Sequence, residues 1–288
     1  MDNIAIITDS TSDIPVSLAK EYGIIIMPLY VGFEGKLYKE GETITSEKVY
    51  EKLEAGVKVN TSAPSTGDFT NIFRDLIEEK GKNLIYCIHL SSKLSGTVNS
   101  ANQAKKFFPQ AKIKVIDSKN VTLSLGLIVL EAARAAREGK SEEEIDSLIE
   151  SLIKKSKFFA TIENFEYLFK GGRAPFLRKL LSKSIIFKLI ITIDKNGKIK
   201  PKKFVRNRKN TFIEFCRQVK KASSSAKKVH IGIFYGSGKK TALELEKLIR
   251  DDSDIEIDEI ILTEITTIIS AHTGPGICGI AVCPKVEY

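Results

Sequence analysis

Cysteine and histidine are scarce in this sequence, which has four cysteines and three histidines among its 288 residues. No two cysteines have the Cys-x-x-Cys spacing, and the histidines, His89, His230 and His272, are far apart in the chain. A disulfide framework or a zinc site would need cysteines and histidines at recurrent close spacings. The composition favours neither, and a reducing cytoplasm is the expected location.

Long apolar runs are also missing from the N-terminal stretch MDNIAIITDS (1–10). It has an acidic residue at position 2 and an apolar run of only four residues. A secretory signal has a basic start and a longer apolar segment, and a transmembrane helix needs about 20 apolar residues. We therefore expect this stretch to be neither a signal peptide nor a membrane span.

The short motifs that mark many enzyme classes are absent. The sequence has no GxSxG nucleophile elbow, no Walker glycines followed by lysine, no GxGxxG and no HExxH. Without a nucleotide-binding loop or a recognisable nucleophile, the sequence favours binding an anion over transforming one. A stand-alone hydrolase or kinase is the less favoured hypothesis.

Acidic residues are few in the second half of the chain. Residues 1–150 carry 18 Lys and Arg against 22 Asp and Glu, and residues 151–288 carry 27 against 14. The halves have net charges of −4 and +13, which sum to the +9 of the whole chain. A basic half indicates either lysine-rich solubility or an acidic partner such as nucleic acid, a membrane surface or an acidic protein. A nucleic-acid-binding regulator is therefore the alternative function, although the basic run at 202–209 has no helix-turn-helix pattern.

Apolar runs alternate with helical patterns through the first half. This alternation predicts βαβ units, with a mostly parallel sheet covered by helices on both faces. Capping boxes, Ser65 with Asp68 and Ser141 with Glu144, mark two of the helix starts. The predicted strands of this half are 4–8, 24–31, 84–90 and 113–116, and the predicted helices are 15–22, 46–54, 65–81, 95–108, 123–137 and 141–154.

The second half has a different pattern. Asn196-Gly197 between two apolar runs, 185–194 and 198–205, predicts an antiparallel hairpin. Strands are also predicted at 158–162, 229–235, 255–262 and 277–282, with helices at 241–249 and just before Lys170. The sequence thus predicts an α/β protein of two domains, 1–156 with a mostly parallel sheet and 157–288 with a mixed sheet and helices.

Hydroxyl-rich segments lie at the predicted ends of several strands. In an open parallel sheet ligands bind at the carboxyl ends of the strands, so these hydroxyls are expected to converge on one rim. Each segment could also serve only as a turn or cap. Ser95 is expected to cap a helix whose N-terminus can hold a carboxylate or phosphate, and Asp9 and Asp117 are expected to fix loops. The segments are TDSTSD (8–13), NTSAPS (60–65), SSKLSGT (91–97) and DS (117–118).

Glycines flank two cationic or titratable residues of the second half. Arg173 follows Gly171 and Gly172, and His272 precedes the sequence Thr-Gly-Pro-Gly. Glycine lets the backbone approach a ligand closely, so both side chains are candidates to face one. A turn with an exposed polar residue is the plainer interpretation of each.

Seven ordered segments are spread over almost the whole chain: TDSTSDIP (8–15), PLYV (28–31), TSAPS (61–65), LSSKLSGT (90–97), IDS (116–118), GGR (171–173) and HTGPG (272–276). Together they resemble the motifs of the DegV family of bacterial fatty-acid-binding proteins. The resemblance implies two α/β domains that bury a long acyl chain such as palmitate. It also implies a cytoplasmic lipid carrier, the binding subunit of a two-part fatty acid kinase, which does not catalyse alone and needs no cofactor.

The same resemblance implies partners and site residues. The partners are the fatty acid and a separate ATP-binding kinase subunit, without nucleic acid and with at most transient contact with a membrane surface. The carboxylate is expected at Thr61 and Ser95, with Ser62, Ser92 and His272 as its neighbours, and no metal is expected. Arg173 is expected at the mouth of the site, where it would meet the kinase subunit or the phosphate. Ala63 stands where the family commonly has glutamine.

The energetics of such a ligand are dominated by its tail. Burying a chain of about 16 carbons at ~0.8 kcal/mol per methylene contributes on the order of 10 kcal/mol before ordering costs. The head group then needs only orientation. Hydroxyls and helix N–H groups are expected to hold the carboxylate without a buried countercharge, which suits a group that must be phosphorylated and released.

Overall fold

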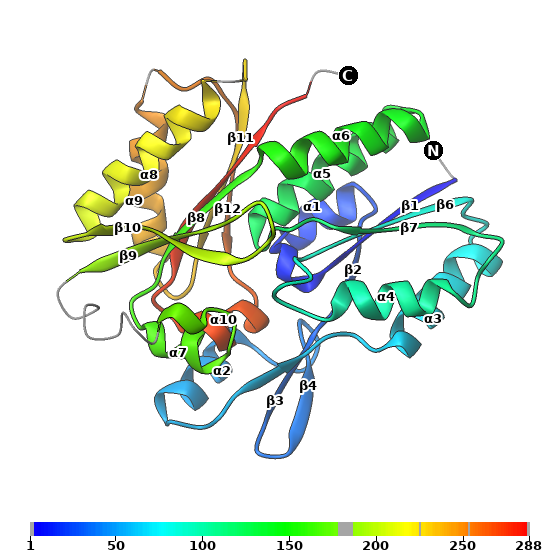
Figure 1. Ribbon diagram of the computed structural model, residues 1–288, viewed down its shortest axis with the longest axis horizontal. Helices are drawn as coiled ribbons and strands as arrows, with labels where there is room; N and C mark the ends of the chain where they lie inside the picture. Colours follow the sequence, from blue (N-terminus) through cyan, green and yellow to red (C-terminus); the bar gives the residue numbers. More distant parts are fainter. Residues whose placement is uncertain (1–2, 178–186, 225, 253, 287–288) are drawn as a thin grey trace.

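A four-stranded parallel sheet organises the first half of the chain (Figure 1). The computed structural model describes residues 3–177, 187–224, 226–252 and 254–286. The strand order is β2-β1-β6-β7, and every neighbouring pair is parallel, as the sequence predicted. The strands are β1 (Ile4–Asp9), β2 (Ile25–Met27), β6 (Leu84–His89) and β7 (Lys112–Asp117).

Helices cover both faces of this parallel sheet. On one face, α3 (Thr66–Arg74) and α4 (Thr97–Lys105) pack buried side chains such as Phe69 and Ala101 against the strands. The other face carries α5 (Leu123–Arg137) and α6 (Glu142–Lys155), and α1 (Val16–Glu21) also packs on this side. Both predicted capping boxes are present, at the starts of α3 and α6.

A six-stranded mixed sheet forms most of the second half. Its order is β10-β9-β8-β13-β11-β12, and only β11 and β12 are parallel neighbours. The predicted Asn-Gly hairpin joins β9 to β10, with Gly197 at φ +80°; the predicted residues 185 and 186 lie outside the described residues. The strands are β8 (Lys157–Thr161), β9 (Lys188–Ile193), β10 (Ile199–Val205), β11 (Val229–Tyr235), β12 (Ile257–Glu264) and β13 (Cys278–Pro284).

Helix α5 lies between the two sheets and contacts both (Figure 1). Two glycines permit this close packing. A Cβ on Gly126 of α5 would lie 2.5 Å from the Ser12 carbonyl oxygen, and one on Gly232 of β11 would lie 2.6 Å from Cβ of Leu123. The two halves of the chain therefore share one continuous core, with α5 at its centre.

A third sheet, which the sequence analysis did not predict, has three antiparallel strands in the order β4-β3-β5. The single strand predicted at 24–31 is wrong, because Pro28 separates β2 from β3. Helices α2 (Ser46–Glu54) and α10 (Thr267–Thr273) pack against the small sheet through residues such as Val49 and Ile268. The strands are β3 (Tyr30–Phe33), β4 (Lys36–Lys39) and β5 (Asn60–Ser62).

Two further helices flank the large sheet, where α8 (Arg208–Ser223) and α9 (Lys239–Arg250) cover the face opposite α5. Helix α8 was not predicted, because its first residues were interpreted as part of the basic run, although its apolar residues Phe212, Phe215, Cys216 and Val219 have helical spacing. The short helix before Gly171 is α7 (Phe165–Lys170), which contacts α10. Within the part of the chain that the structure describes, no helix is long and apolar enough to span a bilayer.

Candidate functional site

A cavity of about 120 Å³ lies where the first half of the chain meets the second. Its walls are mainly apolar, and its described lining contains no Asp or Glu. The lining residues are Thr11, Leu29, Thr61, Ser62, Ala63, Leu90, Leu94, Ser95, Gly96, Val121, Thr122, Phe158, Ile162, Leu168, Arg173, Ile191, Ile199, Ile268, Ile269, His272, Thr273 and Ile277.

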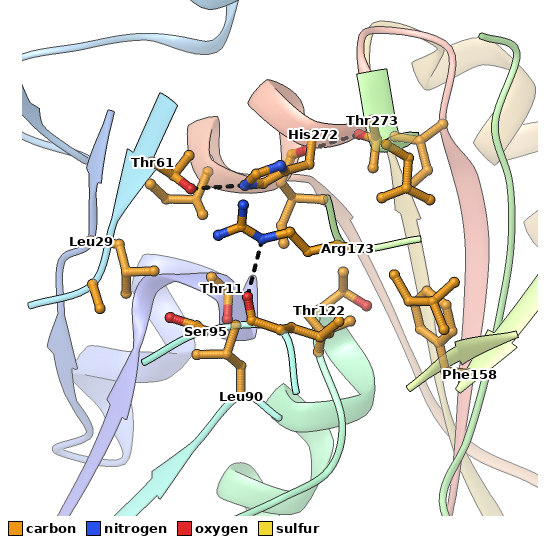
Figure 2. A pocket seen from close by; sticks show the side chains of 18 of the residues that line it. Thr11, Leu29, Thr61, Leu90, Ser95, Thr122, Phe158, Arg173, His272 and Thr273 are labelled. Carbon is orange, nitrogen blue, oxygen red and sulfur yellow. Dashed lines mark hydrogen bonds between the residues drawn. The ribbon is translucent and has the colours of Figure 1, made fainter. Parts of the chain in front are cut away.

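Polar and apolar residues occupy different parts of this cavity (Figure 2). Thr61, His272, Arg173 and Ser95 lie near one another, and Phe158 lies at the opposite end. The remaining wall of that end is aliphatic, contributed by strands and helices of the second half. The cavity thus offers a polar head region and an apolar body.

Thr61 and His272 form a hydrogen-bonded pair across the two halves of the chain. Thr61 lies on β5, His272 lies on α10, and the threonine Oγ1 is 2.8 Å from the histidine Nε2. Burial, reinforced by repulsion from the Arg173 guanidinium, lowers the pKa of His272 from 6.5 to about 4. The imidazole is therefore neutral at pH 7, and its buried Nδ1 has no hydrogen-bond partner among the residues that the structure describes.

The Arg173 guanidinium points into the space between the His272 pair and Ser95 (Figure 2). Its Nε donates to the Leu94 carbonyl oxygen at 3.2 Å, and Nη1 donates to the Gly171 carbonyl oxygen at 2.5 Å. These two bonds fix the side chain, and no described residue of the cavity lining is an Asp or Glu that could neutralise its charge. Burial lowers the pKa of Arg173, although a guanidinium stays charged at neutral pH. That a carboxylate is held here without a buried countercharge stays a prediction, beside a guanidinium that is half-buried.

The three serines predicted for the site are placed differently. Ser95 lines the cavity, and its hydroxyl is 2.9 Å from Oγ1 of Thr97; the N-cap of α4 is Gly96, so the predicted cap at Ser95 is wrong. Ser62 also lines the cavity but is exposed. Ser92 does not line it, because its hydroxyl donates to the Asp117 carboxylate at 2.5 Å.

A metal site has no support in this geometry. No group of three or more His, Cys, Asp or Glu side chains could hold a metal ion in the described ranges. A neutral imidazole, hydroxyls and an unpaired guanidinium instead suit a monovalent anion. Joined to an apolar body, they suit an amphiphile with one acidic head.

Comparison with known proteins places the chain in a family. Residues 3–285 match the family described as uncharacterised proteins of the DegV family. The chain belongs to the DegV family. A DegV domain-containing protein of Caldanaerobacter subterraneus is 34% identical over 280 residues, which are 97% of this chain and 98% of the relative.

Two solved DegV structures superpose closely on this chain. A Thermus thermophilus protein, described by its fatty acid binding, has a TM-score of 0.93 at 28% identity and covers 98% of this chain and 100% of its own. A stearic-acid-binding protein from Eubacterium ventriosum has a TM-score of 0.88 at 26% identity, with 98% of each chain covered. The two-part α/β architecture predicted from the DegV motifs is thus confirmed.

The first DegV motif, TDSTSD, organises the loops around the cavity. The Asp9 carboxylate accepts hydrogen bonds from the Thr11 amide and hydroxyl and from the Leu90 amide, and it lies 3.0 Å from Nδ1 of His89. Ser10 accepts from the Leu29 amide. Asp9 therefore fixes loops, as predicted, and Asp117 does the same by accepting from the amides of Ser92 and Lys119.

The last residue of this DegV motif holds α10, the helix that carries His272. Asp13 accepts from the Thr266 amide at 2.9 Å, and Glu40 accepts from the Ile268 amide at 3.0 Å and from the Thr267 hydroxyl. Burial raises the pKa of both carboxyls. This role could not be predicted from the sequence, because partners more than 200 residues apart leave no local pattern.

The DegV motif LSSKLSGT receives the tip of the β9–β10 hairpin. The Ser91 hydroxyl donates to the Gly197 carbonyl oxygen at 2.8 Å, and a Cβ on Gly197 would lie 2.1 Å from Oγ of Ser91. Ile191 and Ile199, one on each strand of the hairpin, line the cavity. The hairpin is therefore one wall of the cavity, fastened at its tip to the first half of the chain.

Proposed function

We propose that this protein binds one long-chain fatty acid in the cavity between its two halves. The observation that carries the proposal is Arg173, a half-buried cation in a mainly apolar cavity whose described lining residues include no carboxylate. A carboxylate there would neutralise the charge through charge-assisted hydrogen bonds. Solved DegV relatives described as binding fatty acids support the same ligand class.

The carboxylate is assigned to the space bounded by Arg173, Thr61, His272 and Ser95. Because the neutral His272 adds no second positive charge, the single positive charge of Arg173 balances the single negative charge of a carboxylate. Ser62, at the exposed edge, is assigned a secondary contact. The Ser92 hydroxyl donates a hydrogen bond to Asp117, and we assign Ser92 the role of fixing the conformation of its loop.

The acyl tail is assigned to the apolar body that ends at Phe158. Aliphatic side chains from β9, β10 and α10 surround this space. At ~0.8 kcal/mol for each buried methylene, a tail of palmitate length supplies most of the affinity. The head group then orients the ligand.

We further propose that the bound carboxylate is presented to a separate ATP-binding kinase subunit. The DegV resemblance supports this step, together with the described lining residues of the cavity, which offer hydroxyls and a guanidinium but no carboxylate base. Arg173 would neutralise the added charge of an acyl phosphate. The protein would then act as a lipid carrier in the cytoplasm and would not turn over ATP alone.

The nucleic-acid alternative receives less support from the structure. Two cations of the basic run already face acids, since Lys203 is 2.5 Å from Glu214 and Arg208 is 3.5 Å from Glu244. Binding to DNA with a steep salt dependence would revive this alternative.

Mass spectrometry of an organic-solvent extract tests the ligand directly. Protein purified from a bacterial host should yield about one long-chain fatty acid per chain, and a lipid-free extract from folded protein would contradict the proposal.

Arg173→Ala should weaken fatty acid binding about tenfold, because a charge-assisted contact is lost. Lys170→Ala, which removes an exposed cation from α7, is the matched control and should bind normally.

A further inference from the structure

A second pocket of about 140 Å³ lies where α8 and α9 begin, against the ends of β8 and β13. It is distinct from the acyl cavity, although Ile277 contributes to both walls. Polar and charged side chains make up much of its lining, and Glu163 is its single acid among the described lining residues. The lining residues are Thr161, Glu163, Lys188, Arg208, Thr211, Phe212, Ser237, Gly238, Thr241, Pro275, Gly276, Ile277 and Cys278.

Two cations at this second pocket are only loosely paired. The Arg208 guanidinium donates to Oγ1 of Thr241 at 3.3 Å and lies 3.5 Å from the Glu244 carboxylate. Nζ of Lys188 is 3.6 Å from the Glu163 carboxylate. Because exposed pairs at these distances contribute little, both cations can reorient towards a bound anion at small cost.

The N-terminus of α9 opens into the second pocket. Its N-cap is Gly238, which has no side chain, so the first amides of this 12-residue helix have no side-chain acceptor. The loop before it is fixed, since the Gly236 amide donates to the Ile277 carbonyl oxygen and the Ser237 amide to that of Pro275, each at 2.9 Å. Free N–H groups on a rigid helix start attract anions.

An orphaned hydroxyl also lines the second pocket. Thr161 is 8% exposed, and its buried Oγ1 has no hydrogen-bond partner among the described residues. Along β8 side chains alternate, so that Phe158 faces the acyl cavity while Thr161 lines the pocket beside α8. A buried hydroxyl without a partner is destabilising, and a hydrogen bond to a ligand oxygen would offset that cost.

We propose that this second pocket binds a phosphate group, either as inorganic phosphate or as part of a small phosphomonoester. A phosphate presents several acceptor oxygens in a tetrahedral arrangement. These oxygens can accept from the α9 amides, the Thr161 hydroxyl and the Arg208 guanidinium together, whereas a planar carboxylate has only two. The pocket is separate from the fatty acid site, so the proposal does not depend on the proposed function.

Calorimetric titration with inorganic phosphate tests this second site, at constant ionic strength because surface charges are screened by salt. Three variants of the full chain are compared with the unmodified protein. Arg208→Ala should weaken phosphate binding about tenfold, through loss of a charge-assisted contact. Thr161→Val keeps the shape but removes the hydroxyl, and it should weaken binding several-fold. Lys209→Ala removes a neighbouring exposed cation that does not line the pocket, and it should change nothing.

The outcomes distinguish a specific phosphate site from non-specific attraction of phosphate by surface cations. Saturable binding that only Arg208→Ala and Thr161→Val weaken supports the proposal. Absence of saturable binding, or equal weakening by Arg208→Ala and Lys209→Ala, overturns it. Titration with glycerol 3-phosphate then distinguishes the sources: tighter binding than that of phosphate supports a phosphomonoester, and equal binding supports the free ion. The fatty acid content of each variant, measured in parallel, shows whether the acyl cavity is intact.

Discussion

At the scale of single residues, the burial of His272 beside the Arg173 guanidinium determines how the head region responds to acid. The imidazole is buried with its pKa lowered to about 4, while in the unfolded chain it titrates near 6.5. Between these values the unfolded state binds a proton that the folded state does not. Stability from this residue is therefore complete above pH 6.5 and is lost as the pH falls towards 4.

Replacing His272 by glutamine measures this pH dependence. Relative to His272→Gln, the unmodified protein without fatty acid should lose on the order of 3 kcal/mol of unfolding free energy between pH 7 and pH 4. Denaturant unfolding at a series of pH values gives the difference. Bound fatty acid should reduce the loss, because a nearby carboxylate favours the protonated imidazole. A parallel pH dependence in the two proteins would contradict the assignment.

Asp13 provides a second test at the residue scale. Its carboxylate accepts from the Thr266 amide at the start of α10, and burial raises its pKa. Asp13→Ala should lower the unfolding free energy by about 1–3 kcal/mol, because a buried amide loses its acceptor. Asp13→Asn keeps an acceptor oxygen of the same shape and should cost less. Equal losses in thermal unfolding would show that the hydrogen bond to α10 is not the reason.

At the scale of elements, the β9–β10 hairpin is predictable in form but not in its contacts. Asn196-Gly197 indicated the turn because a tight hairpin needs positive φ, and Gly197 has φ +80°. The docking of its tip on Ser91 depends on how the two halves pack, which no local pattern encodes. The same holds for Arg173. The two glycines before it identified it as a candidate site residue, but its position near His272 follows only from the fold.

Gly197→Ala tests what the docked hairpin contributes. The methyl group would meet Oγ of Ser91 and strain a positive φ, so we expect lower stability and faster release of fatty acid. Gly35→Ala is the control, since Gly35 also has positive φ (+74°) in the β3–β4 turn but has open space around it. Release should quicken only in Gly197→Ala, as followed by transfer of a fluorescent fatty acid to vesicles. Equal release from both variants would show that strain alone matters.

The remaining element-scale errors have physical causes. The small sheet was missed because its strands are three or four residues long, too short for a clear alternation. Helix α8 was missed although Phe212, Phe215, Cys216 and Val219 repeat at helical spacing, because its basic first residues were interpreted as a charged run. By contrast, α5 was predicted at 123–137 and spans those residues, because it is long and mostly apolar. Periodicity is thus present in both long helices, while contacts between the halves remained beyond it.

At the scale of the whole molecule, the predicted boundary after residue 156 divides the sequence but not the core. Helix α5 belongs to the first half, yet it packs on β11 and β13 of the second. His230 of β11 adds a charged contact at this junction: it lies 3.3 Å from Glu131 of α5 and 2.9 Å from Glu259 of β12. These carboxylates outweigh its desolvation and raise the pKa of His230 to about 9.

Expressing residues 1–156 alone tests whether the first half folds independently. The fragment would expose the apolar face of α5 that β11 and β13 cover, so we expect aggregation or a marginally stable fold. Calorimetry and size-exclusion chromatography would detect either. A monomeric fragment that unfolds cooperatively near the temperature of the full chain would show instead that the boundary separates autonomous domains.

The cavity draws its walls from both halves, and this has a thermodynamic consequence. A ligand held by Thr61 and Ser95 on one side and by Arg173 and His272 on the other binds only when the two halves are assembled. Ligand binding then raises the free energy of unfolding, by about 2.7 kcal/mol when the free ligand is at 100 times the dissociation constant. The melting temperature of the purified protein would report the lipid supply of the cell that made it.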